Sequence, residues 1–90
     1  MANYKIAETD TFSKKIRSTK YASLYKKIND YVYPLLRINP FFGPNIKKLK
    51  GELKDIYRYR IGDYRLFYKI SEETVIIFIL DIEARKDAYR

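Results

Sequence analysis

The sequence predicts an α+β fold with two N-terminal helices packed on one face of a twisted, mainly antiparallel four-stranded sheet. Apolar residues recur at helical spacing over residues 12–36, and apolar and polar residues alternate over residues 55–70. A third segment, residues 74–82, is apolar on both faces. The expected order is strand, helix, helix, strand, strand, strand, and we expect residues 1–90 to form a single domain.

A short strand and a short helix are expected first. Residues 4–7 alternate between apolar and polar side chains, which is typical of a strand. Residues 9–11, Thr-Asp-Thr, are all types that favour the N-cap of a helix. Phe12 and Ile16 are four residues apart, so they lie on one face of the helix that follows.

A longer helix is expected from Tyr21 onward. Its apolar residues fall on one stripe: Tyr21, Leu24, Tyr25, Ile28, Tyr31, Val32, Leu35 and Leu36. Pro34 interrupts the pattern and is expected to kink the helix or to end it a turn early. Prolines and glycines then indicate a loop over residues 38–51, with Phe41 and Phe42 anchored to the core.

The remaining residues are expected to form a three-stranded meander. A strand over residues 55–61 and a second over residues 64–70 are joined by a tight turn at residues 62–63. The third strand, residues 74–82, is expected to be interior and covered on both sides. Residues 83–90 are expected to pack back on the sheet.

The alternation separates two faces of the predicted sheet. The side chains expected beneath the helices are Tyr57, Tyr59, Tyr64, Leu66 and Tyr68. The cations expected on the opposite face are Arg58, Arg60, Arg65 and Lys69, with Arg85 and Lys86 nearby. The cations expected in the preceding solvated basic loop are Lys47, Lys48 and Lys50, and we expect them to contact phosphates of a polyanion without sequence preference.

The composition excludes several kinds of active site. The chain has 19 Lys and Arg against 11 Asp and Glu, a net charge of +8, which predicts attraction to polyanions such as nucleic acid. It has no His and no Cys, which excludes Ser-His-Asp and Cys-His hydrolases, disulfides and the commonest metal ligands. We therefore expect no metal or other cofactor, and proton transfer by Lys, Tyr, Asp or Glu.

The chain is expected to be cytoplasmic and to make no contact with a membrane. Its first residues lack the apolar stretch of a signal peptide. The longest apolar run, residues 75–80, is far shorter than the roughly 20 residues that span a bilayer.

Three stretches together resemble the RelE/ParE toxin superfamily. They are LKG at residues 49–51, YRYRIGDYRLFY at residues 57–68 and IEARKDAYR at residues 82–90. The resemblance implies the toxin of a bacterial or archaeal type II toxin–antitoxin module. It also implies that the toxin is a monomer within a hetero-oligomer formed with a cognate antitoxin. Members of the RelE branch cleave mRNA in the ribosomal A site without metal, by attack of the ribose 2′-OH on the phosphodiester. Members of the ParE branch inhibit DNA gyrase, and the closing tyrosine here is more similar to the RelE branch.

The resemblance also implies roles for single residues. Arg65 matches the arginine expected to hold the scissile phosphate, and Arg85 matches one expected to stabilise the transition state. Tyr89 matches a C-terminal tyrosine that stacks on a base or acts as general base, with Lys86 as the next candidate for proton transfer.

Two departures from the family pattern bear on catalysis. Arg58 and Arg60 stand where the best-known RelE enzyme has lysines, and Ala84 stands where many relatives have His. Arginine binds phosphate bidentately but does not lose its proton, so Arg58 and Arg60 are expected to bind phosphate and not to act as bases.

Structural explanations of the same residues stay open at this point. Arg58 and Arg60 could form an ordinary solvated strand face, and Arg65 could pair with Asp63 or Asp81. A gyrase inhibitor without nuclease activity and a non-toxic basic nucleic-acid-binding domain are the alternative functions.

Overall fold

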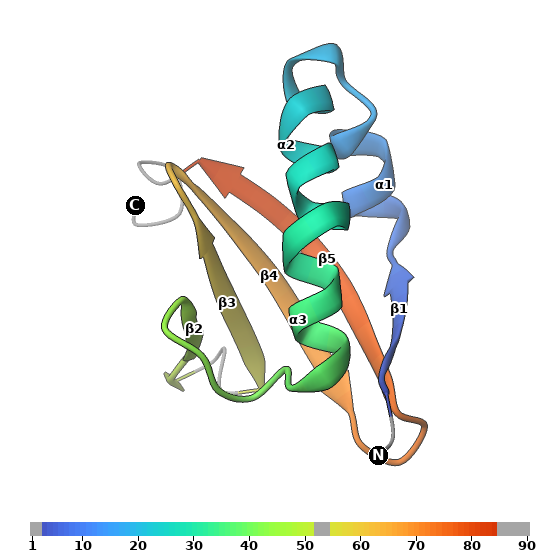
Figure 1. Cartoon of the computed structure of the whole chain (residues 1–90), viewed down its shortest axis with the longest axis vertical. Coiled ribbons are helices and arrows are strands. Elements are labelled where there is room, and N and C mark those ends of the chain that lie inside the picture. The colour runs from blue at the N-terminus through green and yellow to red at the C-terminus, as the bar shows by residue number, and fades with distance from the viewer. Residues whose placement is uncertain (1–2, 52–54, 85–90) are drawn as a thin grey trace.

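The computed structural model describes residues 3–51 and 55–84, in which helices lie on one face of a single sheet (Figure 1). The elements in chain order are β1 (Lys5–Glu8), α1 (Asp10–Ile16), the 3₁₀ turn η1 (Thr19–Tyr21), α2 (Ala22–Lys27), the π-helical turn η2 (Ile28–Val32), α3 (Tyr33–Ile38), β2 (Ile46–Lys48), β3 (Ile56–Ile61), β4 (Tyr64–Ser71) and β5 (Ile76–Ala84). The predicted α+β fold is confirmed, although the numbers of strands and helices differ slightly. In the part of the chain that the structure describes, no helix has the length and apolar character needed to cross a membrane.

The sheet has five strands in the order β1-β5-β4-β3-β2, so β5 is an interior strand. β1 runs parallel to β5, and the other neighbouring strands are antiparallel. The expectation of four strands was wrong because β2 forms inside the segment expected to be a loop. Its three residues pair with β3 but are too few to show an alternating pattern in the sequence.

The last strand is shifted from its expected place. β5 begins at Ile76 and not at Thr74, and it extends to Ala84. Val75 has a φ of 58°, a left-handed conformation that belongs to a turn and not to a strand. Residues 85–90, the rest of the expected tail, lie outside the described residues.

A bulge in β5 decides which of its side chains face the helices. Leu80 is the extra residue in the register with β4. Ile79 and Ile82 are therefore both buried, although strict alternation would place them on opposite faces. Phe78, on the face away from the helices, is 37% exposed, so the expectation that both faces of this strand are covered was wrong.

α2, η2 and α3 form one continuous helical segment over residues 22–38. The predicted effect of Pro34 takes the form of a π-helical turn just before it, without ending the helix. Proline has no N–H to donate to the carbonyl four residues earlier. In the wider turn the N–H of Tyr33 donates to the carbonyl of Ile28 instead.

The π-helical turn changes which residues face the core. Tyr33 is only 2% exposed, whereas Tyr31 is 69% and Leu35 is 55% exposed. The predicted stripe was therefore wrong at Tyr31 and Leu35. An extra residue in the turn rotates the following positions around the helix axis, and a regular helical period cannot predict that rotation.

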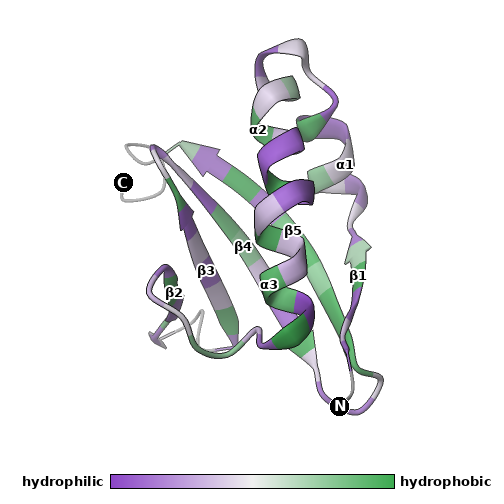
Figure 2. Ribbon diagram, in the orientation of Figure 1, coloured by the Kyte–Doolittle hydropathy of each residue, from purple (hydrophilic) through white to green (hydrophobic). Residues whose placement is uncertain are grey.

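The core lies between the helical layer and the sheet. Its buried apolar residues are Phe12, Ile16, Tyr21, Leu24, Ile28, Val32, Tyr33, Leu36, Tyr59, Leu66, Tyr68, Ile77, Ile79 and Ile82. All five side chains expected beneath the helices belong to this core or pack against it: Tyr57, Tyr59, Tyr64, Leu66 and Tyr68. Figure 2 shows the contrast between the mostly apolar interior strand β5 and the more hydrophilic β3.

Pro40 and Phe41 attach the start of the segment after α3 to the core, and Phe42 does not. The ring of Phe41 packs edge-on against Tyr57, with 5.9 Å between the ring centroids. The Tyr68 hydroxyl donates a hydrogen bond to the carbonyl of Pro40 at 2.7 Å. Phe42 is 80% exposed, so the expectation that it anchors the loop was wrong.

A carboxylate joins β1 to the helical layer. Glu8 accepts hydrogen bonds from the hydroxyls of Tyr25 at 2.9 Å and Tyr33 at 2.7 Å. Burial, together with this carboxylate, raises the pKa of Tyr33 far above its ordinary value. Burial also raises the pKa of Tyr68, so both buried phenols stay neutral at physiological pH.

Candidate nucleic-acid interface

The face of the sheet away from the helices carries a row of cations. The register places Lys47 opposite Arg58, and Arg60 opposite Arg65. Alternation along the strands puts these residues on the face opposite the core tyrosines, and Lys69 lies further along β4 on the same face. We call Lys47, Arg58, Arg60, Arg65 and Lys69 the basic strip.

The members of the basic strip differ in exposure. Lys47, Arg60 and Lys69 are exposed, and Arg58 is half-buried. Arg65 is 3% exposed. The strip therefore combines accessible charges with one guanidinium that is held inside the fold.

Arg65 is held by the turn between β3 and β4. Its Nη1 donates hydrogen bonds to the carbonyl of Gly62 at 3.2 Å and to the carbonyl of Tyr64 at 2.9 Å. These bonds fix the guanidinium close to the end of the hairpin. A side chain so placed stabilises the turn in addition to any role in binding an anion.

The basic strip contains two cross-strand pairs of like charge. Arg60 lies directly opposite Arg65, and Lys47 directly opposite Arg58. Like charges in this arrangement destabilise a sheet, and a bound anion reduces their repulsion and can accept charge-assisted hydrogen bonds from the exposed members. Guanidinium groups suit the two oxygens of a phosphodiester in particular. The arrangement is therefore typical of a surface that binds an anion.

Two of the predicted phosphate-binding lysines do not lie in the strip. Lys48 pairs with Tyr57 in the register, on the helix-bearing face, and its Nζ lies 5.8 Å from the centre of the Tyr57 ring. Alternation along β2 separates it from Lys47. Lys50 is exposed beyond the end of β2.

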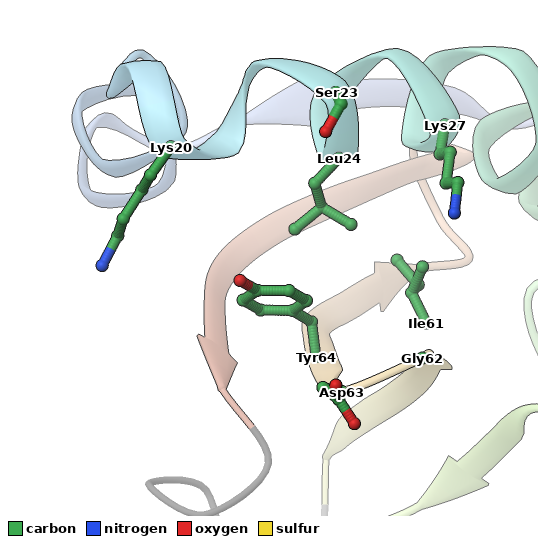
Figure 3. Close-up of a pocket in the computed structure, with 8 residues that line it drawn as sticks. All are labelled: Lys20, Ser23, Leu24, Lys27, Ile61, Gly62, Asp63 and Tyr64. Atoms are coloured by element: carbon green, nitrogen blue, oxygen red, sulfur yellow. The ribbon is translucent and has the colours of Figure 1, made fainter.

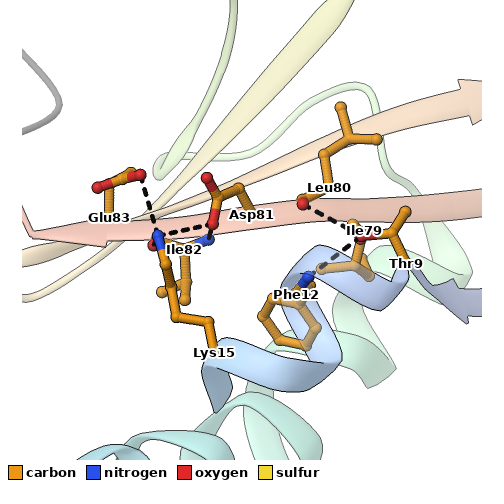
Figure 4. Close-up of polar contacts among 8 residues, drawn as sticks. All are labelled: Thr9, Phe12, Lys15, Ile79, Leu80, Asp81, Ile82 and Glu83. Atoms are coloured by element: carbon orange, nitrogen blue, oxygen red, sulfur yellow. Dashed lines mark hydrogen bonds and ion pairs between the residues drawn. The ribbon is translucent and has the colours of Figure 1, made fainter.

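An ion cluster covers the edge of β5 beyond the end of β1 (Figure 4). From α1, the Lys15 Nζ lies 2.9 Å from Asp81 Oδ1 and 3.0 Å from Glu83 Oε1, and it donates to the carbonyl of Ile82 at 2.9 Å. Burial lowers the pKa of Lys15, but the hydrogen bonds and charges of Asp81 and Glu83 outweigh it and raise that pKa above its ordinary value. Lys15 is thus a permanent cation whose ammonium group donates a hydrogen bond to a carbonyl of β5.

The start of α1 is joined to the same strand. Thr9 is the N-cap of α1, and its hydroxyl oxygen accepts a hydrogen bond from the N–H of Phe12. The same hydroxyl lies 2.8 Å from the carbonyl of Ile79 and 3.1 Å from that of Leu80, to which it can donate. α1 is therefore attached to β5 at both of its ends.

Glu83 is a carboxylate beside the candidate site, and no pattern in the sequence favoured it as a site residue. It lies opposite Arg65 in the register of β4 and β5, so the strip has a carboxylate beside it. This carboxylate already binds Lys15. The spacing of Arg65 and Glu83 along the chain contains no signal for this neighbourhood, because only the register of the hairpin creates it.

A shallow cleft lies between α2 and the turn that holds Arg65. It has a volume of about 300 Å³ and is lined by Lys20, Ser23, Leu24, Lys27, Ile61, Gly62, Asp63 and Tyr64. In Figure 3 the side chains of Leu24 and Tyr64 approach one another across it, and Lys20 extends outward from its rim. The cleft has both a carboxylate and ammonium groups, so its charge favours no particular ligand.

Three predicted catalytic residues lie outside the described part of the chain: Arg85, Lys86 and Tyr89. The described chain ends at Ala84, which lies opposite Tyr64. Arg85 follows this position directly in the sequence.

The sequence of this chain is similar to those of a family of toxins. Residues 6–89 match the model of the family described as ParE toxin of type II toxin–antitoxin system. Toxin RelG of Mycobacterium tuberculosis is 41% identical over 44 residues, which are 49% of this chain and 51% of that toxin. The match therefore spans about half the length of that curated relative.

Solved structures of similar shape include chains from two protein complexes, the first of them a toxin–antitoxin complex. A chain of the RelBE2 complex from Mycobacterium tuberculosis superposes with a TM-score of 0.73 at 24% identity, over 92% of this chain and 99% of that one. A chain of the archaeal RelE–RelB complex from Pyrococcus horikoshii superposes with a TM-score of 0.71 at 27% identity, over 92% and 96%. The first likeness shows the fold alone.

Proposed function

Since the chain belongs to the ParE toxin family of type II toxin–antitoxin systems, within the RelE/ParE superfamily, we propose that it is a ribosome-dependent mRNA endonuclease. The observation that carries this proposal is the basic strip, with Arg60 directly opposite Arg65. Arg60 is exposed, so its guanidinium can bind the two non-bridging oxygens of a phosphodiester, and the buried charge of Arg65 beside it adds to the attraction.

The proposed reaction uses the RNA's own nucleophile. The ribose 2′-oxygen attacks the adjacent phosphorus, a bond from phosphorus to the 2′-oxygen forms, and the bond to the 5′-oxygen breaks. A base takes the proton of the 2′-OH and an acid protonates the 5′-oxygen, which leaves a 2′,3′-cyclic phosphate and a 5′-hydroxyl. Cations stabilise the charge that accumulates on the phosphorane.

We assign the phosphate-binding part to the basic strip. Arg60 and Arg58 supply charge to the non-bridging oxygens, and Arg65 lies beside them in a position fixed by its hydrogen bonds to the turn. Lys47 and Lys69 extend the contact along the RNA backbone. Because these contacts are to phosphates, we expect the affinity for RNA to fall as the salt concentration rises.

The proton-transfer part is assigned to the residues that follow β5. Arg85 is proposed to stabilise the transition state, and Tyr89 to take the proton of the 2′-OH. If Tyr89 stacks on a base instead, Lys86 is proposed to take that proton. Tyr89→Phe separates these roles, because it keeps the ring for stacking and removes the proton acceptor.

A protein that binds and neutralises this toxin is part of the proposal. The similar structure from Mycobacterium tuberculosis is a toxin–antitoxin complex, and the one from Pyrococcus horikoshii is a complex of RelE with RelB. We propose a cognate antitoxin for this chain, and a cytoplasmic location, where the ribosome and its mRNA are found.

Toeprinting on translating ribosomes tests the proposal. The purified chain should produce cuts within A-site codons, and Arg60→Ala should slow cleavage by about 10²–10³-fold, as the loss of one transition-state donor does elsewhere. Lys14→Ala removes the same charge from α1, where Lys14 is exposed, and should cleave like the unchanged chain. Intact mRNA in cells whose growth has stopped would contradict the proposal.

The family name supports a second candidate, inhibition of DNA gyrase. This function predicts inhibited supercoiling and DNA damage with no new RNA ends. A supercoiling assay beside the toeprint distinguishes the two. Salt-dependent nucleic-acid binding without toxicity would indicate the third alternative, a plain binding domain.

A further inference from the structure

An apolar patch lies on the outer side of the helical layer. Tyr31, Leu35 and Ile38 recur at intervals of four and three residues along η2 and α3, and they are 69%, 55% and 68% exposed. Phe42 follows in the next loop and is 80% exposed. We call these four residues the apolar patch. Exposed apolar side chains grouped in this way mark interaction surfaces, whereas single ones need no explanation.

The patch continues into an apolar cleft. The cleft has a volume of about 240 Å³, and its apolar lining comes from Leu35, Ile38, Phe42, Pro44, Ile46 and Tyr59. It lies where the end of α3, the following loop and the first residue of β2 meet. In Figure 2 the last turn of α3 is mostly green, the colour of hydrophobic residues, with one purple band, and the green reaches the start of the loop.

The loop that carries Phe42 has a defined conformation. Asn39 Oδ1 accepts hydrogen bonds from the N–H groups of Phe41 at 2.9 Å and Phe42 at 3.4 Å. A side chain on Gly43 would approach Ile46 Cδ1 to 3.2 Å, so the backbone there packs closely on the start of β2. Phe42 is thus directed outward by structure around it, which favours a surface that is formed before its partner binds.

The charges around the patch restrict its occupant. Arg37 directly precedes Ile38 in the sequence, Lys47 and Lys48 directly follow Ile46, and all three cations are exposed. The chain has a net charge of +8, so a second copy would bring further cations to the same surface. A segment with apolar side chains and acidic neighbours would complement both the patch and its surroundings.

We propose that the apolar patch and its cleft anchor an acidic, apolar segment of the partner antitoxin. The identity of the partner rests on the proposed function, whereas the chemistry of the segment rests on the patch itself. The patch lies on the helix side of the sheet and the basic strip lies on the other side, with the edge strand β2 between them. An antitoxin that covers both surfaces passes around β2 and is held by two sites of different physical character.

These two sites predict different responses to salt. Burial of the apolar patch contributes affinity that depends little on ionic strength, whereas contacts with Arg58 and Arg60 weaken as salt increases. Variants of the two surfaces can therefore be told apart by the slope of log affinity against log salt, and not only by the size of the loss.

The experiment measures binding of the full chain to the antitoxin encoded by the reading frame beside its own gene, by calorimetry over a range of salt concentrations. Ile38→Ser with Phe42→Ser should weaken binding at least tenfold with an unchanged salt slope. Both side chains are largely exposed, so the fold, checked by circular dichroism, should be retained. Ala22→Ser with Asn29→Ser is the control, because both residues are exposed on the helical segment and belong neither to the apolar patch nor to the basic strip.

Three results would overturn the proposal: unchanged affinity of the patch variant, an equal loss from Ala22→Ser with Asn29→Ser, or a patch variant whose loss comes with a flatter salt slope. A change in the oligomeric state of the chain alone would overturn it too, because the patch would then bind a second copy. The toeprint without antitoxin separates this test from the proposed function. If neither the chain nor its patch variant cleaves mRNA, the nuclease proposal fails and the binding result stands.

Discussion

Lys15→Met tests whether one ammonium group stabilises the edge of β5. The Lys15 Nζ contacts Asp81, Glu83 and the carbonyl of Ile82, all within 3.0 Å. Methionine keeps most of the apolar stem and removes the charge and the donors. The substitution therefore isolates the polar contacts of Lys15 from the packing of its side chain.

The expected loss in the free energy of unfolding is about 1–2 kcal/mol. A hydrogen bond to a charged group contributes about 1.5–3 kcal/mol when it is buried, and an exposed ion pair contributes at most about 1 kcal/mol. The side chains of Lys15 and its two acidic partners are between 31% and 33% exposed, so water screens part of each contact and the sum falls between these limits. Because the pKa of Lys15 is raised, this contribution is fully present at neutral pH and is lost only as the pH rises above its ordinary value of 10.5.

Equilibrium unfolding in urea, followed by circular dichroism, measures the effect. Lys14→Met is the control, since Lys14 is exposed in the same last turn of α1 and its loss changes the net charge and the helix-end interaction equally. The midpoint should fall for Lys15→Met at an unchanged slope. Free energies that agree within about 0.3 kcal/mol for the two variants would refute the reasoning. In a Glu83→Gln background the effect of Lys15→Met should shrink, because one of its partners is already uncharged.

Three further predictions concern the fold. Leu36→Ala should destabilise by about 2–5 kcal/mol in urea unfolding, whereas Leu35→Ala should change stability by less than about 0.5 kcal/mol; similar losses would contradict the rotation caused by the π-helical turn. The free energy of unfolding should fall as the pH rises above 10.0, the ordinary pKa of tyrosine, because Tyr33 and Tyr68 keep their protons in the fold and release them on unfolding. A free energy of unfolding that does not change with alkaline pH would argue against their burial. Gly62→Ala should destabilise by about 1–2 kcal/mol without a steric clash, since its φ is +54° and no atom lies within 4 Å of an added Cβ; unaltered thermal stability would show that the turn relaxes.

Much of the fold could be predicted because most elements are long enough to show a period. The alternation over β3 and β4 correctly separated the core tyrosines from the cations. The helical stripe failed at Tyr31 and Leu35, where the π-helical turn before Pro34 changes the phase. β2 was missed because its three residues are too few to show an alternating pattern of apolar and polar side chains.

The candidate site was predictable as a face and not as a set of contacts. Alternation placed Arg58, Arg60 and Arg65 together, and the structure has them on one face. It could not predict that Arg65 is buried against the carbonyls of its own turn, or that Glu83 lies opposite it. Both depend on the register of the hairpin and on a bulge in β5, which arise from tertiary packing.

The parallel pairing of β1 with β5 has a consequence for how the chain folds. Every partner of β1 in the sheet lies in residues 76–79, and the Thr9 hydroxyl binds a carbonyl 70 residues away. β1 therefore has no strand to pair with until β5 has been synthesised. Closing so long a loop costs only about 0.6 kcal/mol more than closing one half as long, but contacts so distant in sequence form late and slow folding. A growing chain that still lacks β5 has its helices and the hairpin of β3 and β4 but cannot complete the core, because Ile77, Ile79 and Ile82 come from that strand. The sheet on which the basic strip depends is thus completed only once β5 has been synthesised.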